Sequence, residues 1–255
     1  MCKNICVITG AAEGIGKETL FKYLDNGYEC LAIDKNQDNI EKIEKVIPKN
    51  LSEKMNILNL DLLEEESIEK IYQRVEKIVC NKSNITLVNN VGGSIYWQTD
   101  KGELSWECFK STLNFNLKPM FLLSRKLIKL MRKNKKGHIV NVASISGRAA
   151  LRTVQEDYAC AKAGVVGFSR RLAAEVGQDN ILVNTICPGI IGTERILTRW
   201  RNRDEAINKN ILKNIPLGRV GNPKEVANAI YFMGSEENTY ITGAILDVNG
   251  GMYMP

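Results

Sequence analysis

Short hydrophobic runs alternate with helical patterns along almost the whole chain. The runs are rich in Val and Ile and lack a polar residue at every second position, as expected for parallel strands buried on both faces. They predict strands over residues 5–9, 30–33, 55–60, 85–89, 139–143, 181–186 and 244–248. Between them, the spacing of apolar residues predicts helices over residues 15–26, 38–46, 65–79, 104–133, 158–176 and 223–233.

The strict alternation of strands and helices predicts an α/β fold, because parallel neighbours need crossover connections. We expect a doubly wound parallel sheet of about seven strands with helices on both faces. No Pro/Gly/Ser-rich linker, repeat or low-complexity segment divides the 255 residues, so one domain over residues 1–255 is predicted. Residues 194–215 are polar, aromatic and irregular, and no regular element is expected there.

Composition and charge narrow the class of protein. The chain is 44% hydrophobic and 25% charged, which is typical of a globular protein with one large core. Its apolar runs are too short to cross a bilayer and its start lacks the layout of a signal peptide, so a cytoplasmic protein is expected. The net charge is +6, and the basic cluster over residues 125–136 suits the end of a helix. No aromatic residues interleave with that cluster, so we do not expect nucleic-acid binding.

The cysteine and histidine content argues against several chemistries. The seven cysteines are scattered and contain no C-x-x-C pair, so neither a zinc site nor a disulfide framework is expected. His138 is the single histidine and lies just before a predicted strand. Ser-His-Asp, Cys-His and zinc-histidine mechanisms would all depend on this residue. We therefore expect none of them, and no bound metal.

A glycine-rich segment joins the first predicted strand to the first predicted helix and reads TGAAEGIG over residues 9–16. Small residues allow the backbone to approach a pyrophosphate, and the following helix N-terminus supplies N–H donors and a positive dipole. The spacing G-x3-G-x-G departs from the common G-x-G-x-x-G, so a plain tight turn stays an alternative. The position between strand and helix favours the dinucleotide loop of a Rossmann-type domain.

Asp34 ends the second predicted strand and bears on the choice of cofactor. An acid at this place can bind both hydroxyls of an adenosine ribose, and it repels the 2′-phosphate of NADP. Glu13 adds a second negative charge inside the glycine-rich loop. Two unit charges about 5 Å apart at an effective dielectric near 20 interact by roughly 3 kcal/mol, which is enough to select NAD. Asp34 could instead cap the next helix, and Lys35 would soften the preference.

Tyr158 and Lys162 lie four residues apart in YACAK, so a helix places them on one face. A tyrosine titrates near pH 10, and acting as an acid or base near neutrality requires a shift of about 3 units, roughly 4 kcal/mol. An ammonium about 4 Å away supplies on the order of 4 kcal/mol at an effective dielectric of 20. Such pairs also occur by chance on exposed helices, so the pair alone is weak evidence for catalysis. Ser144 supports the prediction, because it follows the fifth strand at the rim where open sheets bind ligands.

Together these motifs resemble the short-chain dehydrogenase/reductase family over essentially the full chain. The matching pieces are TGAAEGIG, Asp61 after the third strand, NNVG at 89–92, Asn116, Ser144, YACAK, Pro188-Gly189 and Thr193. The resemblance implies that Tyr158 is the general acid/base and that Lys162 lowers its pKa and holds the nicotinamide ribose. It also implies that Ser144 orients and polarises the carbonyl and that Asn116 supports a water-mediated proton relay.

The resemblance further implies an NAD(H) site along the strand ends. Asp61 would contact adenine, Asn89 the adenosine side, and the segment 188–193 the nicotinamide carboxamide. Beside Tyr158 and Lys162, the residues expected at the cofactor are Gly10, Glu13, Gly14, Ile15, Gly16, Asp34, Asp61, Leu62, Asn89, Val91, Gly92, Pro188, Gly189, Ile191 and Thr193. Family members are commonly homotetramers, so we expect a homotetramer or homodimer paired through the helices near 104–133 and 155–177.

The substrate, a small molecule, is expected between Ser144 and Tyr158 and beside the loop region 194–215. Arg148 and Arg152 would bind a carboxylate bidentately, unless they face solvent or a neighbouring subunit. Trp97, Trp106 and Trp200 are candidates for lining the pocket, although ordinary packing explains at least two of them.

Two subfamilies compete for the substrate prediction. VNNVGGSI over residues 88–95, with the two arginines, is similar to NAD-dependent dihydroxycyclohexadiene-carboxylate (cis-diol) dehydrogenases. The end of the chain, from YITG to VNGGMYM, is similar to 3-oxoacyl-carrier-protein reductases. Those reductases usually use NADPH and dock an acidic carrier through basic residues, where Lys135 fits and Asp179 has the wrong sign. We therefore expect a small cyclic hydroxy or cis-diol compound, and a catalytically silent NAD-binding sensor is the minor alternative.

Overall fold

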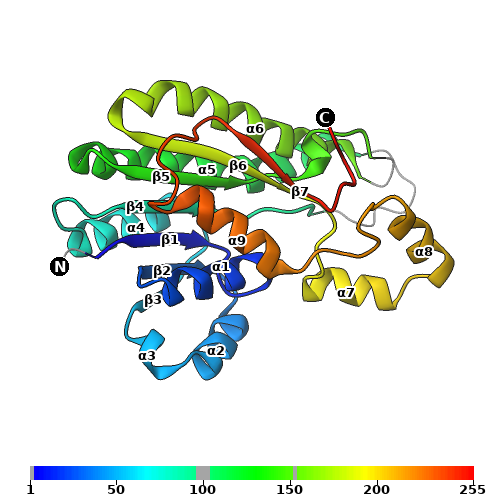
Figure 1. The fold of residues 1–255 in the computed structure, drawn as a ribbon, viewed down its shortest axis with the longest axis horizontal. Coiled ribbons are helices and arrows are strands. Elements are labelled where there is room, and N and C mark those ends of the chain that lie inside the picture. The colour runs from blue at the N-terminus through cyan, green and yellow to red at the C-terminus, as the bar shows by residue number, and fades with distance from the viewer. Residues whose placement is uncertain (1–2, 96–103, 152–153) are drawn as a thin grey trace.

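Seven parallel strands form a single sheet in the computed structural model, which describes residues 3–95, 104–151 and 154–255 (Figure 1). The order across the sheet is β3-β2-β1-β4-β5-β6-β7. The strands are β1 (Ile5–Thr9), β2 (Glu29–Asp34), β3 (Met55–Asn59), β4 (Ile85–Asn89), β5 (Gly137–Val142), β6 (Ile181–Pro188) and β7 (Ile245–Val248). β1 and β4 are neighbours at the centre of the sheet. The strands that follow β1 lead to one edge and those that follow β4 lead to the other, so the carboxyl ends of β1 and β4 flank the crevice where doubly wound sheets bind ligands.

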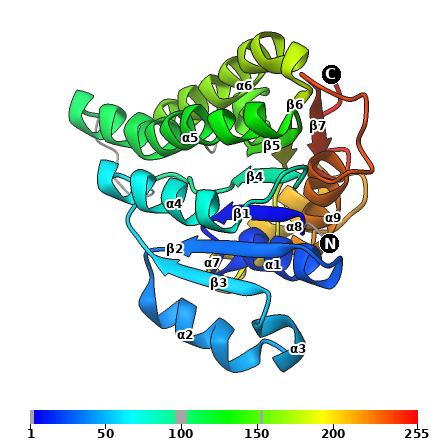
Figure 2. The ribbon, with the colours of Figure 1, turned by 90° about the vertical axis from the view of Figure 1, so that its left-hand side faces the viewer.

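Helices cover both faces of this sheet, as Figure 2 shows. One face carries α4 (Glu65–Ile78), α5 (Trp106–Asn134) and α6 (Glu156–Val176), and the other carries α1 (Gly14–Asp25), α2 (Gln37–Val46) and α9 (Pro223–Gly234). The core divides in the same way, because Ile5 and Val7 of β1 belong to the first layer and Cys6 and Ile8 to the second. Successive strand residues point to opposite faces, and both faces are covered, so the strands need no polar alternation.

Most element boundaries follow the hydrophobic pattern, and the exceptions have a tertiary cause. β6 runs on to Pro188, beyond the predicted end at residue 186, because Pro188 pairs in register with Val248 of β7. α6 begins at Glu156, ahead of Tyr158, so the tyrosine lies inside the first turn of the helix. Three short elements were not predicted: α3 (Lys49–Ser52) and the 3-10 turns η1 (Ile145–Gly147) and η2 (Gly177–Asp179).

Residues 194–215 contain two helices, which corrects the prediction of an irregular segment. α7 spans Glu194–Arg201 and α8 spans Glu205–Lys213. The carboxylate of Asp204 caps α8 by accepting the backbone N–H of Ala206 at 2.7 Å. Asn208 is the single buried residue of α8, and α7 has none. Neither helix therefore carries the buried apolar stripe by which a sequence reveals a helix.

His138 lies within β5, where both of its ring nitrogens contact other parts of the fold. Its Nδ1 is 2.9 Å from Oδ1 of Asn84, and its Nε2 is 3.0 Å from the backbone oxygen of Asn238. Burial lowers the pKa of the imidazole, so it is neutral at pH 7. Over the described ranges, no group of three or more His, Cys, Asp or Glu is placed to hold a metal ion. In the same part of the chain, no helix combines the length and apolarity needed to cross a membrane.

Candidate active site

The glycine-rich loop folds tightly between β1 and α1. Gly10 and Gly14 have φ angles of 63° and 53°, in the left-handed region that favours glycine. A Cβ at Gly16 would lie 1.9 Å from the carbonyl oxygen of Gly10, so only glycine allows α1 to begin this close to the loop. A Cβ at Gly14 would lie 2.9 Å from Cγ2 of Thr193, which places Thr193 against the loop. The missing side chains thus let the loop, α1 and Thr193 pack closely, with the loop backbone bare at these positions.

Asn90 fastens the end of β4 to the same loop. Its side-chain amide donates to the backbone oxygens of Thr9 and Gly10, both at 3.1 Å. In return, the hydroxyl of Thr9 accepts the backbone N–H groups of Asn90 and Val91 at 3.0 and 3.1 Å. Asn90 was not among the predicted site residues, and its only signal in the sequence is its place in NNVG, directly after a buried strand.

Asp34 lies beside the glycine-rich loop at the end of β2. Its Oδ2 accepts the backbone N–H of Ala12 at 2.9 Å, and its Oδ1 accepts that of Asn36 at 3.0 Å. The following helix, α2, is capped by Asn36, whose Oδ1 accepts the N–H of Asn39 at 3.0 Å. The alternative that Asp34 caps this helix is therefore wrong. Glu13 is also near, since its carboxylate accepts the side-chain amide of Asn39 at 3.3 Å.

Asp61 and Leu62 follow β3 at the edge of this region. Oδ1 of Asp61 accepts the N–H of Leu63 at 3.0 Å, and Leu62 is 4% exposed and packs in the core. Lys35 was expected to weaken the preference for NAD. Its Nζ lies 3.5 Å from Oδ2 of Asp61. Both side chains of this pair are well exposed, at 59% and 42%, so the attraction is worth at most about 1 kcal/mol.

Tyr158, Ser144 and Lys162 meet beyond the carboxyl end of β5. Tyr158 and Lys162 come from the first turns of α6, and Ser144 from the connection that enters η1. The side chain of Ser144 is near enough to the phenol of Tyr158 to lower its pKa, and its hydroxyl donates to Oγ of Ser146 at 3.1 Å. The ammonium of Lys162 donates to the backbone oxygen of Val142 at 2.9 Å and lies 5.8 Å from the centre of the Tyr158 ring. The structure therefore brings together three residues that are spread over 19 positions of the chain (144 to 162).

The pKa of Tyr158 differs from the value expected from sequence. Burial raises it above its ordinary value, although the side chain of Ser144 and the charge of Arg195 both lower it. Burial also lowers the pKa of Lys162 to about 8. The sequence-based argument counted the attraction between an ammonium and a phenolate but not the cost of removing both from water. In this state the phenol is protonated at neutral pH, which suits proton donation.

Asn116 of α5 holds the segment that follows β4. Its Oδ1 accepts the backbone N–H of Gly93 at 3.0 Å, and its Nδ2 donates to the backbone oxygens of Gly93 and Thr112, both at 2.9 Å. A Cβ at Gly92 would lie 2.5 Å from Oδ1 of Asn116 and 2.8 Å from Nζ of Lys162. Gly92 therefore lies against both Asn116 and Lys162, and its missing side chain allows these two groups to approach its backbone.

Asp157 is a further residue of this region that the sequence did not reveal. It is fully buried, and its Oδ2 accepts the hydroxyl of Thr112 at 2.6 Å. Its Oδ1 accepts the backbone N–H of Tyr158 at 2.7 Å. The carboxylate therefore joins α5 to the first turn of α6 immediately before the tyrosine. The only signal in the sequence was an acidic residue directly before the tyrosine of YACAK.

Asn89 does not present its side chain to the crevice, contrary to the expected contact with adenosine. Its Nδ2 donates to Oγ of Ser124 at 3.0 Å and to Oδ1 of Asn141 at 2.7 Å, and the residue is 5% exposed. Ser124 belongs to α5 and Asn141 to the neighbouring strand β5. The alternation of side chains along β4 turns Asn89 toward α5. Only its backbone is left for a ligand.

The segment 188–193 returns to the glycine-rich loop from the far side of the sheet. Gly189 donates its N–H to the oxygen of Val248 at 3.0 Å, and a Cβ on it would lie 2.8 Å from Cα of Asn249. Ile191 is buried and forms a bridge with Gly221. These contacts hold the segment so that its last residue, Thr193, lies at the N-cap of α7 and against Gly14, as described above.

Arg148 has a partner within the fold, which corrects its prediction as a substrate ligand. Its Nη1 lies 2.7 Å from Oδ2 of Asp247, and the two side chains are 16% and 15% exposed. Its guanidinium also lies 5.2 Å from the centre of the Tyr253 ring. The charge of Arg148 is matched, so neither a substrate carboxylate nor solvent is needed to explain it. The second predicted ligand, Arg152, lies outside the described residues.

Two of the three predicted tryptophans, Trp106 and Trp200, lie within the described residues. Trp106 is 67% exposed at the start of α5 and stacks on Phe109, with ring centres 5.6 Å apart. Trp200 lies near the end of α7, and its backbone oxygen accepts the side-chain amide of Asn208 at 2.8 Å. Trp97 falls outside the described residues.

The arrangement fits a dinucleotide. Glycines at positions 10, 14, 16 and 92 form a cradle of bare backbone along the ends of β1 and β4, and at each of them a neighbouring protein group lies within 3.2 Å of where a Cβ would be. The N-terminus of α1 at Gly14 offers N–H donors and positive dipole to a pyrophosphate. At one end of the cradle Asp34 offers a carboxylate for ribose hydroxyls, and at the other lie Tyr158 and Lys162. A nicotinamide dinucleotide would be held along this line.

Comparison with known proteins agrees with this geometry. The family model described as enoyl-(acyl carrier protein) reductase matches residues 10–253. The 3-oxoacyl-[acyl-carrier-protein] reductase FabG of Thermotoga maritima is 34% identical over 250 residues, which is 98% of this chain and 97% of that protein. FabG of Escherichia coli is 34% identical over 252 residues, 98% of each chain.

Solved structures show the same architecture over the full length. The structure described as ElxO with NADP bound superposes with a TM-score of 0.87 at 28% identity, over 99% of both chains. YwfH, described as an NADPH-dependent reductase involved in bacilysin biosynthesis, has a TM-score of 0.87 at 25% identity, again over 99% of both chains. With its glycine-rich loop, its Ser144–Tyr158–Lys162 group and these relatives, the chain belongs to the short-chain dehydrogenase/reductase family.

Proposed function

We propose that this oxidoreductase interconverts a secondary alcohol and a ketone by hydride exchange with NAD(H), with Tyr158 as the residue that moves the proton. The observation that carries the proposal is the meeting of Tyr158, Ser144 and Lys162 at the open end of the glycine cradle. The bound nicotinamide supplies or accepts the hydride. The protein supplies position, a proton and electrostatics.

The proton chemistry follows from the contacts of Tyr158. In the direction of ketone reduction, its Oη donates a proton to the carbonyl oxygen. The nearby hydroxyl of Ser144, which donates to Oγ of Ser146 in this structure, would turn its single proton to that oxygen and so orient and polarise it. Lys162 lies close enough to stabilise negative charge on the phenolate that remains. Asn116 keeps the loop at Gly93 in place and bounds the space beside Lys162. For alcohol oxidation the same residues act in reverse.

NAD(H) is proposed over NADP(H) because of the charges around the ribose end of the cradle. The carboxylate of Asp34 accepts two backbone N–H groups, one of them from Ala12. Glu13 follows Ala12 in the glycine-rich loop and adds a second carboxylate to this region. A 2′-phosphate in this place would face two negative groups, at a cost on the order of 3 kcal/mol per close charge pair. Two of the similar structures bear NADP or are described as NADPH-dependent, so the preference has to be measured for this chain.

The variant Asp34→Ser tests the cofactor preference. Removing this carboxylate should lower the ratio of kcat/KM for NAD(H) to that for NADP(H) by about 100-fold, in line with a charge interaction of roughly 3 kcal/mol. Asp38→Ser is the matched control, because Asp38 is an exposed acid four residues further on, in the first turn of α2. It should leave the ratio nearly unchanged. Comparable kcat/KM for the two cofactors in the unaltered enzyme would refute the proposal.

For the substrate we favour a small cyclic hydroxy or cis-diol compound. The relatives named 3-oxoacyl-[acyl-carrier-protein] reductase favour the alternative, an acyl chain on an acidic carrier. Against that alternative, Arg125 and Arg132 of α5 are ion-paired with Glu175 and Asp179, with closest contacts of 2.6 and 2.7 Å. These pairs reduce the positive charge that this end of α5 and α6 could offer to a carrier.

A steady-state screen separates the two substrate classes. The enzyme is assayed with NAD(H) on cis-diols, hydroxy acids and 3-hydroxyacyl thioesters. We expect turnover of a diol or a hydroxy acid. Turnover of the thioesters alone would support the carrier-linked alternative and reject our proposal for the substrate.

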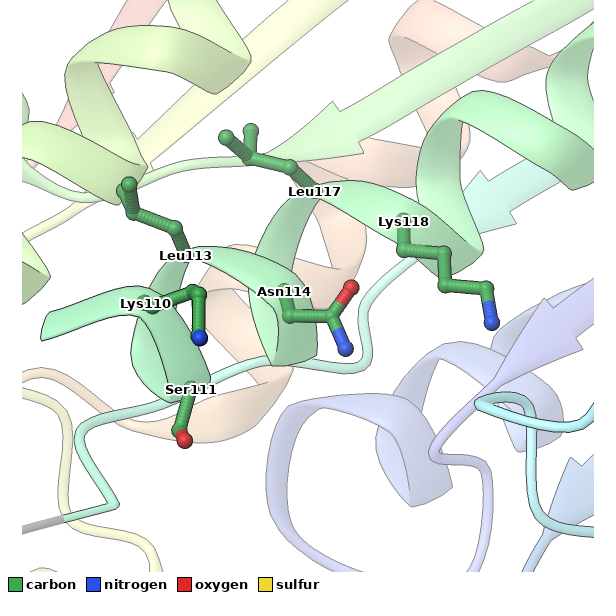
Figure 3. A pocket seen from close by; sticks show the side chains of 6 residues that line it. All are labelled: Lys110, Ser111, Leu113, Asn114, Leu117 and Lys118. Atoms are coloured by element: carbon green, nitrogen blue, oxygen red, sulfur yellow. The ribbon is translucent and has the colours of Figure 1, made fainter. Parts of the chain in front are cut away.

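We also propose that α5 and α6 contact a second copy of the chain, in a homodimer or homotetramer. α5 has a groove, drawn in Figure 3, that is lined by Lys110, Ser111, Leu113, Asn114, Leu117 and Lys118. Next to it, Phe121 is 49% exposed and packs edge-to-face on Phe168 of α6 at 5.9 Å. Exposed aromatic residues of this kind are typical of interfaces. A monomeric mass by light scattering would reject this assembly.

A further inference from the structure

Arg195, which was not among the predicted site residues, lies close to Tyr158 and Lys162. Arg195 belongs to the first turn of α7 and is exposed. A Cβ at Gly93 would lie 3.2 Å from its Nη1 and 3.6 Å from its Nη2, so the guanidinium rests on the backbone of Gly93. Gly93 is the residue that Asn116 holds with two hydrogen bonds. The cation therefore lies over the loop that borders the space beside Lys162.

The charge of Arg195 acts on the reacting residues themselves. It lowers the pKa of Tyr158, and it lowers the pKa of Lys162 by like-charge repulsion. Both effects require the guanidinium to be within Coulomb range of the phenol and the ammonium. Contact with Gly93 and influence on Tyr158 and Lys162 place Arg195 at the mouth of the site, next to where a substrate must sit.

Arg195 has no acidic partner in the part of the chain that the structure describes. The one acid of α7, Glu194, accepts hydrogen bonds from Arg201 at 3.1 Å and from Thr198 at 3.5 Å instead. Arg199 and Arg203 follow Arg195 at intervals of four residues. Burial lowers the pKa of Arg199 most, and the charges of Arg195 and Arg203 lower it further. The positive charge of Arg195, which no acid of the described residues balances, favours a bound anion.

We propose that Arg195 binds an anionic group of the substrate, a carboxylate or a phosphate, and so selects acidic over neutral ketones and alcohols. This inference rests on the proposed function of the site. It replaces Arg148, whose charge is already matched by Asp247, as the residue of this chain that recognises an acid. Its planar fork can hold two oxygens of the anion at once, and the exposure of Arg195 leaves it accessible to a ligand.

The test compares matched acids and esters. Initial rates with NADH are measured for 3-oxocyclohexane-1-carboxylate and its methyl ester, and for acetoacetate and its ethyl ester. Arg195→Ala should lower kcat/KM for the acids by about 10- to 100-fold, the range for a lost charge-assisted hydrogen bond, and change that for the esters by less than about threefold. Arg195→Lys should recover part of the loss. Arg201→Ala, which removes an exposed arginine of the same helix, should change neither.

Two outcomes would overturn the proposal. Equal losses on acid and ester would mean that Arg195 supports the site without recognising an anion. An increase of about tenfold or more in the dissociation constant of NADH, measured by its fluorescence, would mean that the anion is the pyrophosphate of the cofactor.

Binding without turnover separates this inference from the proposed function. In the Tyr158→Phe enzyme saturated with NADH, titration with 3-oxocyclohexane-1-carboxylate should show binding that Arg195→Ala weakens about tenfold or more. If no probe is turned over but this difference in binding is present, the proposed reaction fails and the anion site stands. If the acid binds equally with and without Arg195, or binds to neither, the anion site fails whatever the activity.

Discussion

At the phenol of Tyr158, burial and neighbouring groups act on the pKa in opposite directions. Burial raises it, whereas the side chain of Ser144 and the positive charge of Arg195 lower it. Lys162, whose pKa burial brings down to about 8, keeps its charge at neutral pH and lies 5.8 Å from the ring. Tyr158 is therefore protonated at neutral pH and can donate a proton. It can accept a proton only at a pH high enough to form the phenolate.

Tyr158→Phe should remove most turnover while leaving NADH binding nearly intact. General acid–base catalysis contributes about 10²- to 10⁴-fold, and a loss of this size in kcat is expected. In the unaltered enzyme, alcohol oxidation needs the phenolate, so its rate should still be climbing at pH 10, because burial raises the pKa of Tyr158 above its ordinary value of about 10. Ketone reduction uses the protonated phenol and should not need alkaline pH. Turnover by the variant within tenfold of the unaltered enzyme would contradict the role of Tyr158.

At the scale of elements, the ion pair of Arg148 and Asp247 connects the turn after β5 to the last strand. The two residues are 99 positions apart in the chain and join η1 to β7. Burial raises the pKa of Asp247 even though Arg148 lowers it. Breaking the pair would leave a mostly buried carboxylate without its cation, and that costs more than the pair contributes as a whole.

Arg148→Met should lower the free energy of unfolding by about 2 kcal/mol, between the values for exposed and fully buried pairs. Urea denaturation measures it. In the double variant Arg148→Met, Asp247→Asn, part of the loss should return, because the uncompensated charge is gone. The preference for acid over ester should not change, in contrast to Arg195→Ala. A loss of that preference with unchanged stability would restore Arg148 as the substrate ligand.

At the scale of the whole molecule, His138 links three separate parts of the chain. From β5 it contacts Asn84, before β4, and Asn238, after α9. Burial lowers its pKa most, the charge of Lys136 lowers it further, and the hydrogen bond to Asn238 and the charge of Glu236 raise it. The net result is a neutral imidazole in the folded state and one that titrates near pH 6.5 in the unfolded chain.

This difference makes global stability depend on pH. Below pH 6.5 the unfolded state binds a proton that the folded state does not, so the free energy of unfolding should fall as the pH drops from 7 to 5. One proton corresponds to a slope of at most about 1.4 kcal/mol per pH unit. The variant His138→Gln should be less stable at pH 7 and should lose this part of the slope. Because the chain has one histidine, its NMR titration is unambiguous, and a midpoint at or above 6.5 in the folded protein would contradict the prediction.

Periodicity and local motifs in the sequence determined the order of strands and helices, the glycine-rich loop and the grouping of Ser144, Tyr158 and Lys162. These features are local, because a buried strand or an amphipathic helix shows its burial in its own residues. The chain order of strand and helix then dictates a parallel sheet whose carboxyl ends meet. Nothing in such patterns states which polar side chains meet across the molecule.

Tertiary structure alone decided the remaining features. It turned Asn89 toward α5, matched Arg148 with Asp247 across 99 positions, and laid Arg195 over Gly93. It formed α7 and α8 from segments with almost no buried residues. It also decided the sign of the pKa shift of Tyr158, since desolvation depends on how many atoms from distant segments surround the phenol. Burial and pairing at long range are properties of the assembled fold, and short-range patterns do not contain them.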